Sequence, residues 1–388
     1  MPVKNRFAEL LPEITAWRRD FHENPELLYE VHRTAAKVAG LLRDFGCDEV
    51  VEGIGQTGVV GVIRGRSETS GRVVGLRADM DALPIVEQTG AAHASKVPGK
   101  MHACGHDGHT AMLLGAAKYL AETRNFDGTA VVIFQPAEEG GGGGKAMVDD
   151  GMMERWGIQE VYGMHNMPGI PVGRFAIRPG PMMAATDQFD IVVTGKGGHA
   201  AKPHDCIDTT LVASHIVVAM QQIASRNVDP LKQVVVSICT FRTESEAYNV
   251  IPQTVVLRGT VRSLDPGVRD LAEARVKAVA EGIAAAHGAT VGISYIRGYP
   301  VTMNTPENTD YAVAVAQAVS GQVDTAVAPM MGGEDFSYML NARPGAYIFL
   351  GNGDSAMVHH PAYDFDDSAI PFGSSWYAGM VESRMPAA

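Results

Sequence analysis

The sequence lacks the features that mark several broad classes of protein. Basic residues are few, 32 against 44 acidic ones, and the formal net charge is −12, so we expect no nucleic-acid or anionic-membrane partner. No run of about 18 apolar residues occurs, and we therefore expect no spanning helix. Cysteines are also scarce. The four of them are widely spaced, and the first residues lack the apolar core of a signal peptide, which together favour a reducing cytoplasm.

What the chain does contain is an ordinary globular composition, with 46% hydrophobic and 20% charged residues over 388 positions. This length favours two domains over one. Short apolar segments that are typical of buried strands alternate with helical segments in the outer parts of the chain; the strand candidates are 73–78, 129–134, 161–164 and 346–350. The alternation predicts an α/β domain with a mostly parallel sheet. Pro12 is expected to interrupt the first helix.

Residues 187–298 show a different pattern. Strands that alternate polar and apolar residues and two helices follow one another in the order β-α-β-β-α-β, which is that of a split βαβ sandwich. We therefore expect an inserted α+β, ferredoxin-like domain at 187–298. The larger α/β domain would comprise 1–186 and 299–388.

One short stretch concentrates reactive side chains. The segment His102-Ala-Cys104-Gly-His106-Asp107-Gly-His109 carries five metal-capable side chains within eight residues. Thiolate and imidazole are good ligands for Zn²⁺ and related ions, and Gly105 permits a tight backbone that lets Cys104 and His106 converge. Two other interpretations of this segment alone stay open: a solvated histidine-rich turn, or a nucleophilic Cys104 paired with His106.

Further polar residues follow the predicted strands. In parallel sheets, ligands bind beyond the carboxyl ends of the strands, so residues at these ends gather at one edge. The candidates are Asp79, Asp81, Glu138, Glu139, His165 and His359. Each histidine alone could be an ordinary hydrogen-bonding residue, and an isolated glutamate pair before a glycine run could be solvated. One thiolate, three imidazoles and one carboxylate come from Cys104, His106, His165, His359 and Glu139. These five ligands are too many for one tetrahedral zinc ion, and they fit two ions.

The two adjacent glutamates can have separate roles. On an extended loop, Glu138 and Glu139 cannot point the same way, so one can bind a metal while the other faces the reacting water. His22 and His32 are expected at the surface or at helix ends rather than as ligands. His199, in a glycine-rich loop of the inserted domain, is either an ordinary loop histidine or a donor to a tetrahedral oxyanion.

The motifs together resemble a known family. They are, in order, Trp17–His22 (WRRDFH), Arg77–Pro84 (RADMDALP), Met101–Asp107 (MHACGHD), Phe134–Glu139 (FQPAEE), Gly163–Asn166 (GMHN), Gly195–His199 (GKGGH), Gly332–Ser337 (GGEDFS) and His359–Pro361 (HHP). This pattern is similar to the M20 metallopeptidases, and most similar to their branch of hippurate hydrolases and N-acyl-amino-acid amidohydrolases. It covers nearly the whole chain.

The resemblance implies a site. The metal ligands would be Cys104, His106, Glu139, His165 and His359, holding two divalent ions such as Zn²⁺, Mn²⁺, Co²⁺ or Ni²⁺. Glu138 matches the general base and acid, Asp81 a carboxylate that orients a ligand, and Asn249 and Glu334 residues near the substrate. His199 matches a histidine that reaches the neighbouring subunit's site, so a homodimer through the inserted lid domain is expected.

The chain departs from the wider family at two places, and its final motif departs from the one usual in the hippurate-hydrolase branch. Asp79 stands where many relatives have a ligand histidine, and Cys104 stands where a bridging aspartate is usual. His360 lies between His359 and Pro361, so His360 is an alternative ligand, although alignment to Pro361 favours His359.

The expected activity is hydrolysis of an N-acyl amino acid to a carboxylate and a free amino acid. A dipeptidase or a deacetylase of a metabolic intermediate is the main alternative. Two further alternatives are a metal-dependent binding protein without turnover and a metal-free cysteine hydrolase that uses Cys104 with His106.

Overall fold

The chain divides into two compact units, and the computed structural model describes residues 5–387. The larger unit comprises the chain up to residue 182, residues 303–328 and residues from 335 onward, while the second comprises 183–302 and 329–334. Each unit has its own hydrophobic core. The predicted roles, a catalytic domain at 1–186 and 299–388 and a lid at 187–298, stay predictions.

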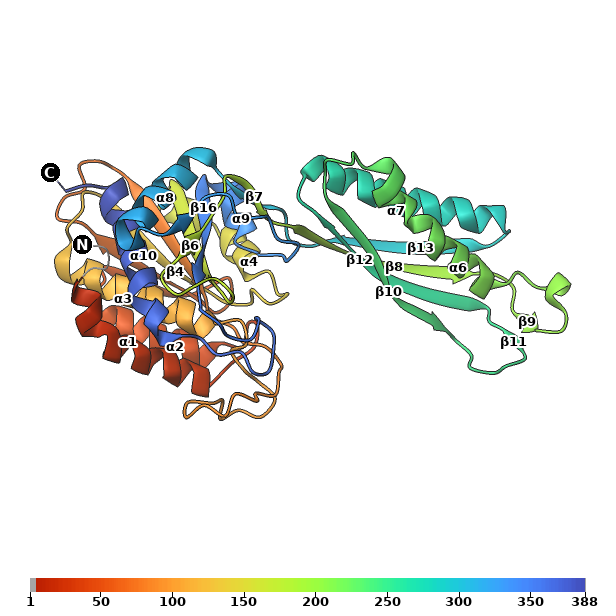
Figure 1. Ribbon diagram of the computed structural model, residues 1–388, viewed down its shortest axis with the longest axis horizontal. Coiled ribbons are helices and arrows are strands. Elements are labelled where there is room, and N and C mark those ends of the chain that lie inside the picture. The colour runs from red at the N-terminus through yellow and green to blue at the C-terminus, as the bar shows by residue number, and fades with distance from the viewer. Residues whose placement is uncertain (1–4, 388) are drawn as a thin grey trace. The chain divides into compact units, whose positions relative to one another are not determined.

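An eight-stranded sheet forms the centre of the larger unit (Figure 1). Across the sheet the strands are β1 (Glu49–Ile54), β2 (Gly58–Arg64), β4 (Thr129–Gln135), β3 (Val73–Asp79), β5 (Glu160–Met167), β16 (Gly345–Gly351), β6 (Phe175–Ala176) and β15 (Val323–Asp324). The four strands predicted from apolar runs, β4, β3, β5 and β16, lie side by side and run parallel. The mostly parallel α/β fold is thus confirmed, and the antiparallel strands β1 and β2 were not predicted.

Helices pack around this sheet. They are α1 (Asn5–Glu23), α2 (His32–Asp44), α3 (His106–Thr123), α4 (Gly143–Asp149), α5 (Met152–Arg155), α8 (Pro306–Ser320), α9 (Ser337–Ala342) and α10 (Ile370–Arg384), with a short 3₁₀ turn at Asp367–Ala369. The expected break at Pro12 is wrong, because α1 continues through it. Ala8 and Pro12 are exposed, so water can satisfy the carbonyl that proline leaves unpaired, while the apolar face of α1 is buried.

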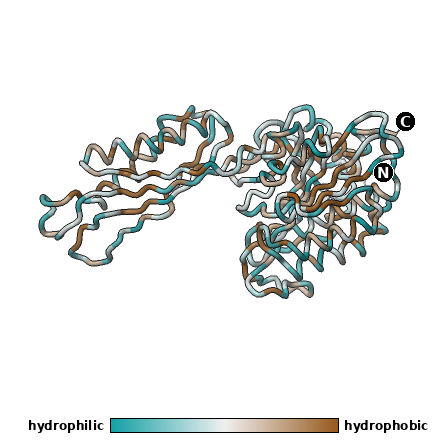
Figure 2. Tube along the Cα trace, turned by 180° about the vertical axis from the view of Figure 1, so that it is seen from behind, coloured by the Kyte–Doolittle hydropathy of each residue, from teal (hydrophilic) through white to brown (hydrophobic). Residues whose placement is uncertain are grey.

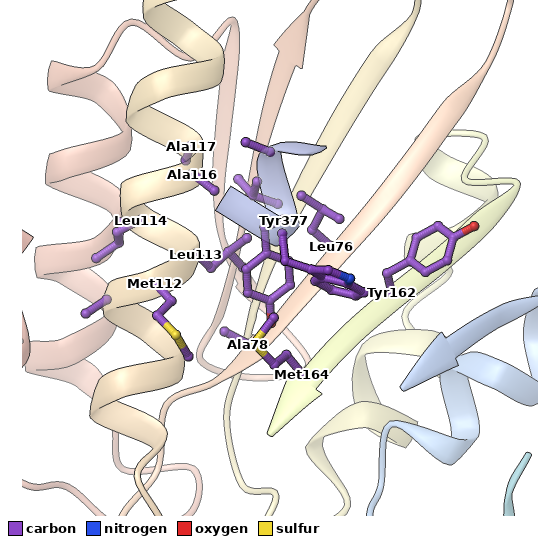
Figure 3. Packing of buried hydrophobic residues seen from close by; sticks show 14 of the residues in the cluster. Leu76, Ala78, Met112, Leu113, Leu114, Ala116, Ala117, Tyr162, Met164 and Tyr377 are labelled. Atoms are coloured by element: carbon purple, nitrogen blue, oxygen red, sulfur yellow. The ribbon is translucent and has the colours of Figure 1, made fainter. Parts of the chain in front are cut away.

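Helix α3 holds the reactive segment in place because it is buried along most of its length. Figure 3 shows Leu113 of α3 directed toward Tyr377 of α10, and Leu114 on the opposite side of the helix. Also labelled there are Met112, Ala116 and Ala117 of α3, Leu76 and Ala78 of β3, and Tyr162 and Met164 of β5. All are buried in one core. In the larger unit, the hydrophobic residues concentrate in the strands of the sheet (Figure 2). Each buried leucine contributes about 2 kcal/mol, so the start of α3 is firmly fixed.

The second unit is an α+β sandwich. Its sheet has the order β10 (Val234–Thr243), β12 (Thr254–Ser263), β8 (Ala185–Thr194) and β13 (Thr290–Arg297), with all neighbours antiparallel. Helices α6 (Thr209–Met220) and α7 (Pro266–Ala286) lie on one face (Figure 1). This is the predicted β-α-β-β-α-β order, although α6 ends at Met220 and a π-helical turn follows at Ile223–Asn227.

The remaining elements are short. Strands β9 (Gly198–His199) and β11 (Val250–Ile251) form a small ribbon in the second unit, which also has a 3₁₀ turn at Pro203–Asp205. Strands β7 (Gly180–Met183) and β14 (Thr302–Asn304) lie where the chain passes from one unit to the other. Over residues 5–387, none of the helices has the length and apolar character needed to cross a bilayer.

Candidate metal centre

Cys104 and His106 meet a histidine from the sheet at the start of α3. Cys104 lies in the loop before the helix, His106 is the first helical residue, and Gly105 between them has a left-handed φ of 86°. His165, within β5, places its Nε2 3.3 Å from Cys104 Sγ. One ligand atom from each of these three buried side chains lies within 4.8 Å of the other two. The sequence predicts His165 just beyond the end of this strand, but the residue lies within it.

Both histidines present the same nitrogen to the shared space. His106 donates its Nδ1–H to the carbonyl oxygen of Asp81 at 2.8 Å, and His165 donates its Nδ1–H to the carbonyl oxygen of Asn166 at 2.5 Å. Each Nε2 is therefore the nitrogen that can bind a metal ion in place of a proton. Among the described residues, His106 Nε2 is buried without a hydrogen-bond partner. An unpaired imidazole nitrogen beside a thiol fits a metal ion, because ligand histidines donate their other ring N–H in this way.

The two glutamates are held in a tight turn after β4. Ala137 has a left-handed φ of 53°, and the backbone N–H groups of Glu138 and Glu139 donate to Asp81 Oδ1 and Oδ2 at 2.9 and 3.1 Å. One ligand atom from each glutamate and from His106 lies within 4.8 Å of the others. The loop is not extended as the sequence predicts, because the backbone turns at Ala137, and only Glu139 also groups with Cys104 and His359. The separate roles of the two glutamates stay a prediction.

His359 approaches from the C-terminal part of the chain. Its Nε2 lies 3.2 Å from Glu139 Oε1, and its backbone N–H donates to the Ala103 carbonyl at 2.7 Å. Cys104, Glu139 and His359 form a second group of potential ligands. His360 instead accepts the backbone N–H of Ala362 on its Nδ1 at 3.0 Å. This geometry supports His359 over His360 as the ligand candidate.

Burial and neighbouring charges shift the pKa values of His106, His165 and Cys104 in different directions. Burial alone would lower the pKa of His106, but the Asp79 carboxylate and Cys104 outweigh it and raise the pKa well above its ordinary value. Burial, together with the nearby His109, lowers the pKa of His165 well below its ordinary value. Burial also raises the pKa of the Cys104 thiol well above its ordinary value. Such a thiol is neutral and a poor nucleophile unless a cation lies beside it.

Two further residues of the reactive segment, His109 and Asp107, form hydrogen bonds to residues of other elements. His109 donates its Nδ1–H to Asp79 Oδ1 at 2.6 Å, and Asp107 Oδ2 accepts the Nδ1–H of His22 at 2.8 Å. His22 is thus at the end of α1, as expected, but it is fully buried and not at the surface. In the sequence, His109 is one of the five metal-capable residues of this segment, and its three-residue spacing from His106 places both on one face of a helix.

His199, predicted to be catalytic, and the predicted substrate residues Asn249 and Glu334 lie in the second unit. His199 pairs with Val250 in the β9–β11 ribbon, and Ala200 donates its N–H to the Asn249 carbonyl at 3.0 Å, so His199 and Asn249 are neighbours. Both are exposed. His199 Nδ1 accepts the Ala201 N–H at 3.1 Å, which leaves Nε2–H as the donor of the ring. Glu334 is buried within 329–334. The functional roles of these residues stay predictions.

Comparisons with known proteins agree with this geometry. The sequence pattern of peptidase family M20/M25/M40 matches residues 75–383. This chain belongs to that family. Hippurate hydrolase of Campylobacter jejuni is 43% identical over 375 residues, which are 96% of this chain and 97% of that protein. Thermostable carboxypeptidase 2 of Saccharolobus solfataricus is 44% identical over 354 residues, covering 90% and 88%.

A solved M20 structure extends the likeness to the fold. A Bacillus subtilis protein described as a dinuclear metal binding peptidase from the M20 family has a TM-score of 0.85 and 34% identity, covering 98% of this chain and 100% of that chain. The class of this M20 chain is therefore that of a metal-dependent amidohydrolase.

Proposed function

We propose that this protein hydrolyses the amide bond of N-acyl amino acids with the help of two divalent ions. Hippurate is an acyl group joined by an amide to an amino acid, and a carboxypeptidase releases an amino acid with a free carboxylate. Both relatives thus cut an amide whose nitrogen belongs to the released amino acid. The observation that carries the proposal is the convergence of Cys104, His106 and His165 with the Glu138–Glu139 turn in one buried place.

The residues divide naturally into two ligand groups. Cys104, His106 and His165 would hold one ion, and Cys104, Glu139 and His359 the other, with Cys104 common to both. Soft and borderline donors favour Zn²⁺, Co²⁺ or Ni²⁺, and Mn²⁺ is also compatible with the carboxylate and imidazoles. When bound, the ions polarise the amide carbonyl and lower the pKa of a water molecule.

Glu138 is the residue we assign to proton transfer. It takes a proton from the attacking water as the carbon–oxygen bond forms, and gives a proton to the amide nitrogen as the carbon–nitrogen bond breaks. The products are a carboxylate and an amino acid. Asp81 keeps the Glu138 backbone in place through its 2.9 Å hydrogen bond. His199, whose Nδ1 accepts the Ala201 N–H, is proposed to donate its Nε2–H to the oxyanion that develops on the carbonyl oxygen.

Other activities make different demands on the site. A dipeptidase would need to accept a charged amino group in place of an acyl chain, and a deacetylase only a small acyl group. A metal-free cysteine hydrolase would need Cys104 and His106 but would not need Glu139 and His359 beside the same sulfur. A binding protein without turnover would not need Glu138 beside the ligands. We also infer a homodimer through the inserted unit, which size-exclusion chromatography with light scattering tests.

Matched substitutions at adjacent glutamates test the proposal. Glu138→Gln should keep both ions and lose about 10²–10⁴-fold in kcat, because only the proton acceptor is removed. Glu139→Gln should lower metal content, because a ligand is removed. Elemental analysis gives the metal content, and a panel of benzoyl-, acetyl- and indoleacetyl-amino acids beside dipeptides gives the rates. Full turnover by Glu138→Gln, or no cleavage of any panel member by the metal-loaded protein, would contradict the proposal.

A further inference from the structure

His109 and Asp79 look like metal ligands in the sequence, and the structure gives them another task. Both are fully buried, and each offers an atom within 4.8 Å of one from His106. A ligand histidine must keep one ring nitrogen free for the ion. His109 could therefore bind an ion only if one of its ring nitrogens had no hydrogen-bond partner.

Both ring nitrogens of His109 are engaged. Nδ1–H donates to Asp79 Oδ1 at 2.6 Å, and Nε2 accepts the backbone N–H of Asn166 at 2.9 Å. The side-chain amide nitrogen of Asn166 also lies 3.0 Å from His109 Nε2. Because a backbone N–H can only donate, Nε2 carries no proton, and the tautomer of His109 is fixed with its proton on Nδ1. No ring nitrogen remains to bind an ion.

Asp79 fixes this tautomer from the other side. Its Oδ2 accepts Nη1–H of the fully buried Arg77 at 2.7 Å, while its Oδ1 accepts from His109. A carboxylate paired with a buried guanidinium accepts hydrogen bonds through both oxygens, so the hydrogen of the His109 ring faces Asp79.

The pair acts on the backbone that carries His165. His109 holds the N–H of Asn166, and the carbonyl of the same Asn166 accepts Nδ1–H of His165. With Nδ1 engaged, His165 Nε2 faces Cys104 Sγ at 3.3 Å. The ring planes of His109 and His165 also meet edge to face, with centroids 4.6 Å apart. The orientation of His165 thus depends on a chain that begins at Arg77.

We propose that Asp79 and His109 are positioning residues that hold His165 as a metal ligand, and that neither is itself a ligand. This rests on the proposed two-ion function. Loss of the pair weakens the ion held by Cys104, His106 and His165, and leaves the ion held by Cys104, Glu139 and His359. Partners of this kind contribute about 10–100-fold to metal affinity.

Four variants of the full-length protein separate positioning from ligation. His109→Ala removes both hydrogen bonds, whereas His109→Gln keeps an amide donor for Asp79 and an oxygen acceptor for Asn166 without offering an imidazole. Asp79→Asn leaves the ring in place but presents an amide N–H to Nδ1, which favours the wrong tautomer. Thr110→Val is the matched control, because it removes a buried hydrogen bond to the Asp79 backbone carbonyl and leaves His109 untouched.

The measurement is a titration with Zn²⁺ against a chromophoric chelator, with unfolding by urea followed in parallel. We expect two ions per chain in the unaltered protein and in Thr110→Val. His109→Ala and Asp79→Asn should bind one ion about 10–100-fold more weakly, and His109→Gln should restore much of the affinity. Asp79→Asn decides the matter if His109→Ala does not fold.

The inference is overturned if His109→Ala and Asp79→Asn bind both ions as tightly as the unaltered protein. It is also overturned if His109→Gln loses an ion as completely as His109→Ala, since that result would make His109 a ligand. Failure of the unaltered protein to bind two ions would instead contradict the proposed function.

Discussion

Gly105 sets the geometry of the thiol and the imidazole on either side of it. Its φ is 86°, and a Cβ added there would lie 2.3 Å from both Asn166 Nδ2 and Tyr363 Oη. These two atoms are themselves hydrogen-bonded, because Asn166 Nδ2 donates to the Cys104 carbonyl at 2.6 Å and Tyr363 donates to Asn166 Oδ1 at 2.7 Å. A methyl group at this position would therefore push directly on the residues that hold the Cys104 loop.

We predict that Gly105→Ala lowers the free energy of unfolding by about 2–5 kcal/mol. About 1–2 kcal/mol comes from a left-handed alanine, and about 1–3 kcal/mol from the overcrowded interior. Metal affinity should fall with it. Gly90→Ala is the control, since Gly90 has φ 68° and nothing within 4 Å, and should show only the backbone cost. Urea denaturation of both variants is the measurement, and equal losses would argue against the steric explanation.

At this scale, the sequence identifies donor types but not their hydrogen-bond partners. Cys104, His106 and His165 could be placed together because each is a good ligand near the end of an apolar segment. His109 is chemically equivalent to His106 in the sequence. Its different state depends on Asp79 and on the backbone of Asn166, which belong to other elements. No local pattern reports which ring nitrogen is occupied.

Helices α1 and α3 are joined by a buried charged contact at the level of whole elements. His22 of α1 donates to Asp107 Oδ2 of α3 at 2.8 Å, and its Nε2 lies 3.3 Å from Glu87 Oε1. Arg18, one turn earlier, lies 3.4 Å from the same Asp107 oxygen. The rings of His93 and His102 also lie near His22. The start of α3, with the site's first ligand candidates, is thus anchored to α1.

This contact predicts a pH dependence of stability. Burial lowers the pKa of His22, but the charge and hydrogen bond of Asp107 outweigh it and raise the pKa from 6.5 to about 9. A raised pKa means that the charged histidine stabilises the fold below its unfolded pKa, and that this contribution is lost as pH rises through 9. The contribution amounts to about 3 kcal/mol at most. Unfolding by urea between pH 6 and 10 should show it.

Two histidine variants separate the contribution of His22 from those of other titrating groups. The difference in unfolding free energy between the unaltered protein and His22→Gln should be largest below pH 6.5 and shrink toward pH 9. His32→Gln is the control, because the His32 side chain is 69% exposed. If the His22→Gln profile runs parallel to that of the unaltered protein over the whole range, the charge of His22 does not contribute to stability.

Elements with a clear period could be predicted, and those whose form depends on neighbours could not. The parallel strands are continuous apolar runs that are buried on both faces. Strand β1 is an edge strand whose pairing with β2 shifts register between Glu52 and Ile54, which obscures any alternation. The helix break predicted at Pro12 is wrong because a local helix breaker is overridden when the helix buries an apolar face on both sides of it.

At the scale of the molecule, the insertion is visible because the sequence changes its period twice. Alternating strands begin at 185 and end at 297, and the buried run at 345–351 then rejoins the first sheet beside β5. The second unit is contiguous apart from 329–334, and its core forms from residues close in sequence. The larger core needs both outer parts of the chain. Two separate cores imply that the units can lose stability separately.

A buried ion pair in the second unit tests this independence. Asp187 of β8 accepts from Arg269 of α7 at 3.1 Å, and from the hydroxyl of Tyr295 in β13 at 2.9 Å. Asp187→Ala leaves a buried arginine without its carboxylate, which costs about 3–5 kcal/mol. We expect calorimetry to show a lower melting temperature for the second unit alone. The metal content of the larger unit should not change.

Asp190→Ala is the matched control, because Asp190 lies in the same strand and pairs with Arg258 at 3.3 Å with both side chains about half exposed. Exposed pairs contribute about 0–1 kcal/mol, so this variant should melt like the unaltered protein. A single transition that shifts as a whole in Asp187→Ala, or a fall in its metal content, would show that the two cores unfold as one. In that case, destabilising the second unit also destabilises the metal centre. The two cores would then belong to one folding unit.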